Sequence, residues 1–66
     1  MTQNEIEGRI ALLLAALDEC RKEQEEVSPT LPGEWGVSHS ISCGASMRHI
    51  NMAITELRFV LANMDK

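Results

Sequence analysis

The residues best equipped for chemistry gather in one stretch, from Trp35 to His49 (WGVSHSISCGASMRH), which holds an indole, two imidazoles, a thiol, four hydroxyls and a guanidinium. Free backbone N–H groups at a helix start bind anions together with serine hydroxyls, and an arginine adds positive charge there. An indole ring stacks on a flat ligand. The stretch therefore predicts a pocket for a small anionic ligand, whose candidate residues are Trp35, Ser38, His39, Ser40 and Arg48.

The same residue types also have a purely structural interpretation. Ser38 or Ser40 can cap a helix, and Trp35 can close the end of a helical bundle. His39, His49 and Arg48 would then be solvated side chains. The sequence leaves both interpretations open.

Metal binding is a further alternative at this position. His39 and Cys43 are four residues apart and share one helical face, and an antiparallel partner helix would bring Cys20 close to Cys43. These ligands are not supported by any Cys-x-x-Cys, His-x-x-x-His or Glu-x-x-His pair. We therefore predict no metal and no other cofactor, and interpret the two cysteines as packed, reduced thiols of a cytoplasmic protein.

The sequence offers no catalytic constellation, which would require a nucleophile with a positioned base or paired carboxylates. His39 and His49 need not face the same way. The acidic run near the end of the first helix is interpreted as a solvated face or as a docking site for a basic partner. It consists of Asp18, Glu19, Glu23, Glu25 and Glu26. The prediction is a protein that is not an enzyme.

Two long helices must position these residues. Thr2 followed by Glu5 forms a capping box, so the first helix is expected to start near Gln3. Apolar residues then recur at alternating spacings of four and three, as in a heptad seam, until Pro29 ends the helix near Val27. The seam consists of Ile6, Ile10, Leu13, Leu17, Cys20, Gln24 and Val27.

The second helix is expected over residues 38–64, after a connecting loop at residues 28–37 that contains both prolines and a Pro32-Gly33 turn. Its seam consists of Met47, Ile50, Ile54, Leu57, Leu61 and Met64. Two helices joined by a ten-residue loop predict an all-α antiparallel hairpin forming one domain over residues 1–66.

One hairpin leaves too much apolar surface in water. All eight residues from Ile10 to Leu17 (IALLLAAL) are apolar, and Met52 and Phe59 form a second line away from the seam. A single partner helix covers only one side of such a helix, so we expect the hairpins to assemble into a helical-bundle homo-oligomer. The predicted interface residues are Leu12, Leu13, Leu14, Leu17, Met52 and Phe59.

Composition restricts the partners further. The 66-residue chain has a net charge of −4, which disfavours binding to a nucleic acid polymer because that requires a clustered basic face. The apolar run is far shorter than the roughly 20 residues that span a bilayer, and no basic segment precedes it as in a signal peptide. A cytoplasmic protein without membrane contact is expected.

The general plan, together with a second helix that reads Met47-Arg48-His49-Ile50-Asn51-Met52-Ala53-Ile54, resembles the phage hairpin sponges that oppose the CBASS and Thoeris defences. The resemblance implies an oligomer of small helical hairpins that sequesters a cyclic nucleotide or related signal between protomers without cleaving it, in the host cytoplasm. It carries over no binding residue, so the pocket residues rest on their own chemistry. The alternatives are an inhibitor or regulator that binds a host protein through its acidic or apolar helix face, and a purely structural assembly element.

Overall fold

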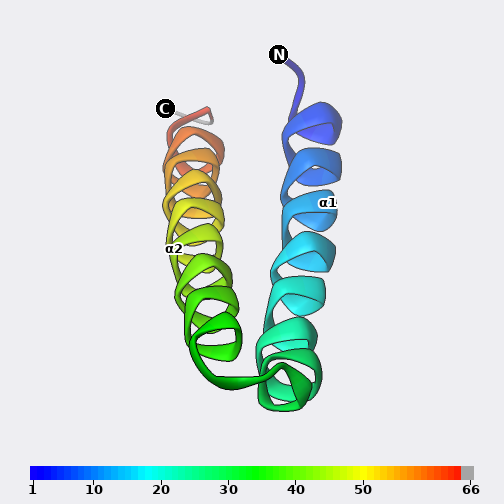
Figure 1. Cartoon of the computed structure of the whole chain (residues 1–66). Coiled ribbons are helices and arrows are strands. Elements are labelled where there is room, and N and C mark those ends of the chain that lie inside the picture. Colours follow the sequence, from blue (N-terminus) through cyan, green and yellow to red (C-terminus); the bar gives the residue numbers. More distant parts are fainter. Residues whose placement is uncertain (65–66) are drawn as a thin grey trace.

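The computed structural model describes residues 1–64 and forms an antiparallel hairpin of two helices, 51 × 14 × 13 Å in extent (Figure 1). Helix α1 spans Gln3–Lys22 and continues into a π-helical segment η1, Glu23–Val27, and a 3-10 segment η2, Ser28–Thr30. Helix α2 spans Gly33–Asn63. The all-α hairpin is thereby confirmed. Within residues 1–64, neither helix combines the length and the apolar character needed to cross a membrane.

The start of α1 follows the predicted capping box. The backbone N–H of Glu5 donates to the Thr2 hydroxyl oxygen at 3.2 Å, and that hydroxyl donates to the Glu5 carboxylate at 3.1 Å. Thr2 has extended backbone geometry, which is typical of an N-cap residue. The predicted start at Gln3 is confirmed.

The two seams meet along the hairpin axis and form a small core. Ile6, Ile10 and Ile54 are buried at its centre. The partly buried residues that pack against them all come from the predicted seams: Leu13, Leu17, Ile50, Leu57 and Leu61. Periodicity therefore identified the face on which each helix contacts the other.

The connection between the helices is much shorter than predicted. Residues 23–30 remain helical, and α2 begins at Gly33, so only Leu31 and Pro32 lie outside a helical segment. Pro29 does not interrupt the run of helical segments. It lies in the first turn of η2, where a backbone N–H has no partner within the helix and its absence costs no hydrogen bond. Leu31 is extended, as expected for a residue that precedes a proline.

The prediction that Ser38 or Ser40 caps the second helix is wrong. The N-cap residue of α2 is Pro32, and no side chain donates or accepts a capping hydrogen bond there. Gly33 has a φ of 50°, which a residue with a Cβ rarely adopts and which turns the chain into the helix. Both serines lie inside α2 and are free for other contacts.

The last turn of α1 contains a small group of charged side chains. Arg21 and Lys22 pair with Asp18, with 3.3 Å between Lys22 Nζ and Asp18 Oδ2. The hydrogen bonds from Arg21 and Lys22 lower the pKa of the Asp18 carboxyl below its usual value of 3.8. All three side chains are well exposed, so the stabilisation is small.

This lowered pKa predicts that the stability of the fold decreases slightly in acid. A carboxyl whose pKa is lower in the folded state than in the unfolded one stabilises the fold above its unfolded pKa. That stabilisation disappears as the pH falls through the folded pKa. We expect Asp18→Asn to melt slightly below the wild type at pH 7, and the difference to close as the pH falls below the usual carboxyl pKa of 3.8 and through the lowered one. Thermal melts followed by circular dichroism at fixed protein concentration measure it, and a difference independent of pH would contradict the assignment.

Candidate functional site

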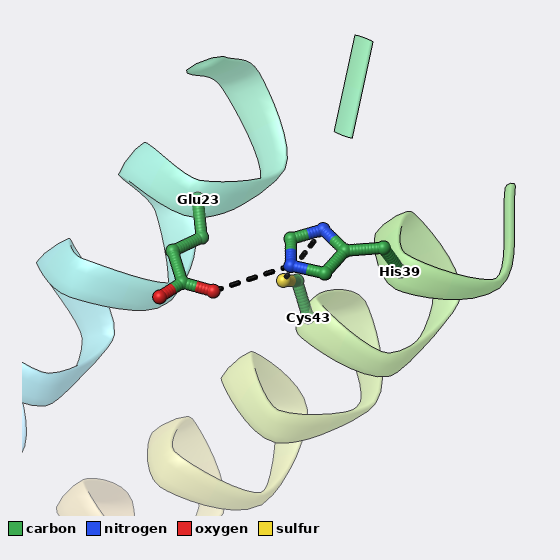
Figure 2. A group of neighbouring side chains, drawn as sticks. All are labelled: Glu23, His39 and Cys43. Carbon is green, nitrogen blue, oxygen red and sulfur yellow. Dashed lines mark hydrogen bonds and ion pairs between the residues drawn. The ribbon is translucent and has the colours of Figure 1, made fainter. Parts of the chain in front are cut away.

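Three side chains with metal-binding or nucleophilic atoms converge where η1 faces the start of α2 (Figure 2). They are Glu23, the first residue of η1, and His39 and Cys43, one turn apart on α2. One ligand atom from each residue lies within 4.8 Å of the other two. The Nε2 atom of His39 lies 3.2 Å from Oε2 of Glu23, and its Nδ1 atom lies 3.8 Å from Sγ of Cys43.

The π-helical segment supplies the position of Glu23. A π-helical turn closes hydrogen bonds between residues five apart, and the backbone N–H of Ser28 donates to the carbonyl of Glu23 in this way. The turn holds one residue more than an α-helical turn, so it changes the register of the residues that follow. It brings both Glu23 and Ser28 against His39 on α2.

Ser28 holds the second nitrogen of the imidazole. Its hydroxyl oxygen lies 2.6 Å from His39 Nδ1, and Ser28 is 7% exposed. The serine hydroxyl can donate or accept, so it suits either protonation state of that nitrogen. The imidazole is thus fixed at Nδ1 by a buried hydroxyl and directed at Glu23 through Nε2.

Burial and charge act on the cysteine of this group. Burial raises the pKa of the Cys43 thiol, and the nearby Glu23 carboxylate and Cys20 raise it further. The thiol is therefore protonated at neutral pH and is a weak nucleophile, because reactivity needs the thiolate. Both cysteines are free, and the cysteine in the group is Cys43 rather than the pair considered from the sequence.

A cross-helix hydrogen bond fixes the register one turn away. The Gln24 side-chain amide donates to the Ser40 carbonyl at 3.0 Å and to the Ser40 hydroxyl at 3.3 Å. Ser40 thus faces α1 and does not line the hollow beside Trp35. Its role in a ligand site between protomers stays a prediction.

A surface hollow of about 630 Å³ lies beside the group, along the first turns of α2. Three of the five predicted ligand residues line it: Trp35, Ser38 and His39. Sequence reasoning missed the other lining residues, Leu31, Glu34 and Ser42. Glu34 brings a carboxylate into a pocket that was expected to attract an anion.

The single chain also shows where Arg48 and Trp35 lie. Arg48 does not line the hollow and lies 13 residues beyond Trp35 on the same helix, about 20 Å along its axis. Trp35 is 75% exposed, so within a single chain it does not close the end of the bundle. The hollow therefore presents an exposed indole, an imidazole and two hydroxyls, without a lysine or arginine from residues 1–64 of its own protomer.

Four of the six predicted interface residues have large exposed side chains. The exposed fraction is 73% for Leu12 and 71% for Phe59, and Leu14 and Met52 are also exposed. Leu13 and Leu17 instead pack partly against the hairpin core. A second hollow, of about 400 Å³, runs between the helices and is lined by Arg9, Leu12, Leu13, Ala53 and Leu57.

Ser28, His39 and Glu23 are linked in the order of a hydrolase triad. Their exposure is the opposite of a triad's, because the serine is buried and the carboxylate is exposed. A nucleophile must reach its substrate, whereas Ser28 is buried. The side chain of Glu23, which would orient the base from within, is 58% exposed. The arrangement therefore favours holding the imidazole in place rather than attack by the serine.

Glu23 and Ser28 are the functional residues that the sequence did not reveal. Glu23 was interpreted as part of a solvated acidic run, and Ser28 as part of a helix stop. Their contribution depends on the π-helical turn and on the register between the helices, and neither leaves a spacing signal in the sequence. Comparisons with known protein families, with curated proteins and with solved structures found no significant match to this chain.

Proposed function

We propose that this chain is a non-enzymatic binding protein that works as a homo-oligomer, with hairpins packed through the apolar side chains that a single chain leaves in water. The observation that carries the proposal is the exposure of Leu12 and Phe59, each above 70%, whereas four hydrophobic residues are buried among residues 1–64. Burying one such side chain contributes roughly 1.5 to 3 kcal/mol.

Several of the exposed apolar residues share a helix face or line one hollow. Ile41, Met52 and Phe59 are spaced by eleven and seven residues, so they share one face of α2, the outer apolar line. The hollow around Leu12 adds an apolar groove between the helices. A second copy of the chain suits these surfaces because it presents the same elongated apolar face, and a small core needs such support.

The ligand that we propose is a small anionic, ring-containing molecule such as a cyclic nucleotide, held between protomers. The hollow beside Trp35 supports this with an exposed indole for stacking and with the hydroxyls of Ser38 and Ser42. Since Glu34 lines the hollow, a phosphate needs a cation from elsewhere. Arg48 of a neighbouring protomer is the candidate that assembly would supply.

The alternative is a protein-binding regulator. The exposed acidic side chains of Glu25 and Glu26 at the turn favour a basic partner surface, and the outer apolar line suits an apolar one. A purely structural element, whose partner is a second copy of itself, would use the same apolar surfaces without a ligand.

Two measurements test the proposal in sequence. Sedimentation velocity over a dilution series is expected to show an oligomer, and a stably folded single chain at all concentrations would refute the assembly. Calorimetric titration of the oligomer with a panel of cyclic nucleotides is expected to show binding that Trp35→Ala weakens and His49→Ala leaves unchanged. A folded oligomer that binds no member of the panel would eliminate the ligand and leave the two alternatives.

A further inference from the structure

We propose that Glu23, His39 and Cys43 bind a zinc ion at the turn of the hairpin, using one carboxylate oxygen, the Nε2 atom of the imidazole and the cysteine sulfur (Figure 2). The site does not require the oligomer, because all three residues belong to one chain, and it borders the ligand hollow through His39.

The atoms are already close to the spacing that zinc imposes. With bonds of about 2.3 Å to sulfur and about 2.0 to 2.1 Å to nitrogen and oxygen, tetrahedral ligands lie about 3.3 to 3.7 Å apart. Glu23 Oε2 and His39 Nε2 are 3.2 Å apart, Cys43 Sγ lies 3.8 Å from the other ring nitrogen, Nδ1, and one ligand atom from each residue lies within 4.8 Å of the other two. Closing the site requires rotation of these side chains, and the Glu23 side chain, 58% exposed, has room to rotate.

The imidazole has the support that a zinc ligand requires. Metal-bound histidines donate their second ring N–H to an oxygen, which fixes the tautomer and directs the free lone pair at the metal. Ser28 provides that oxygen at 2.6 Å from Nδ1. This leaves Nε2 as the coordinating atom, on the side of the ring where Glu23 lies.

The donor set selects the metal. Calcium and magnesium prefer oxygen ligands alone, whereas a thiolate, an imidazole and a carboxylate together are typical of zinc. Three protein ligands are the number found in zinc sites that keep a fourth position for water or another ligand. Zinc binding to the thiolate displaces the proton of the thiol. His39 also lines the hollow beside Trp35, so the site borders solvent-accessible space.

Cobalt titration of the untagged protein provides the test, because Co²⁺ substitutes for Zn²⁺ and reports its ligands optically. We expect the wild type to develop visible bands of tetrahedral Co²⁺ and a near-ultraviolet sulfur-to-cobalt charge-transfer band, and Zn²⁺ to abolish both. Zn²⁺ should also raise the melting temperature, because it binds the folded state.

The chain offers a matched control for each ligand. Cys43→Ser should remove the charge-transfer band while Cys20→Ser retains it, and His39→Gln should weaken Zn²⁺ binding while His49→Gln does not. Ser28→Ala should weaken Zn²⁺ binding by about 10- to 100-fold without removing a ligand. Because Cys43 is buried and its variant can lose the fold, Glu23→Gln, at an exposed position, serves as the second ligand variant.

Three results would overturn the proposal. The first is a folded wild type that shows no sulfur-to-cobalt band at saturating Co²⁺. The second is a band that disappears in Cys20→Ser rather than in Cys43→Ser. The third is Zn²⁺ affinity that is equal in the wild type and in folded Glu23→Gln, which would reduce the group to a hydrogen-bonded network between the helices.

Discussion

Phe59→Asp is expected to dissociate the proposed homo-oligomer into folded single hairpins. Phe59 is 71% exposed within one chain and lies outside the core, so the substitution leaves the contacts between α1 and α2 intact. In an oligomer the same position is covered, and a carboxylate there would lose its water without gaining a partner. We expect the dissociation constant to rise by about 100-fold or more, which corresponds to roughly 3 kcal/mol.

Sedimentation velocity over a dilution series measures this effect, with circular dichroism to confirm that the helices persist. Asn4→Asp is the matched control, because it adds the same charge at an exposed position of α1 away from the outer apolar line and the apolar groove. Equal sedimentation of Phe59→Asp and the wild type would place the interface elsewhere on the hairpin. Leu12→Asp then shows which surface forms the interface, because it should dissociate an oligomer that packs through the apolar groove and leave intact one that packs elsewhere.

Gly36→Ala is expected to destabilise the hairpin, although alanine is the better helix former. A Cβ at position 36 would lie 2.7 Å from the carbonyl oxygen of Ser28 and 3.1 Å from that of Leu31. Both are backbone atoms of the turn, so they cannot swing aside as a side chain can. We expect a loss of about 1 to 3 kcal/mol in the free energy of unfolding, as for other overpacked sites.

Gly8→Ala isolates the steric effect. A Cβ at position 8 would meet no heavy atom within 4 Å, so the substitution should stabilise α1 by up to about 1 kcal/mol through helix preference alone. Chemical denaturation at one protein concentration compares both variants with the wild type. If Gly36→Ala changed the free energy of unfolding by the same amount as Gly8→Ala, the contact between position 36 and the turn would not exclude a Cβ.

The hairpin could be predicted because apolar residues spaced three and four apart must lie on one face of an α-helix, and that face must be buried. Ile6, Ile10 and Ile54 lie on the predicted seams and form the buried centre. The turn was mispredicted because Gly33 and Gly36 are residues that normally indicate a loop. Here each is required by the helix that contains it, Gly33 for its backbone angle and Gly36 for its contact with the turn.

The site was only partly predictable for a related reason. His39 and Cys43 could be placed on one face from their spacing, and three of the hollow's residues were identified from their chemistry. Cys20 was expected as the third ligand, from the first helix; it is near enough to raise the pKa of Cys43, but the third member of the group is Glu23. A heptad pattern assumes α-helical geometry throughout, so it fails at residues 23–27, where the helix widens.

The widened turn at Glu23–Val27 has a consequence for how such a group can arise. An α-helix advances about 100° per residue, so if Glu23–Ser28 had regular α-helical geometry, these two residues, five apart, would point about 140° away from each other around the helix axis instead of sharing one face. The carboxylate and the hydroxyl could then no longer face the same imidazole. The group therefore depends on the widened backbone of residues 23–27 as well as on its residue types, and the same side chains on a regular α-helix would not assemble it.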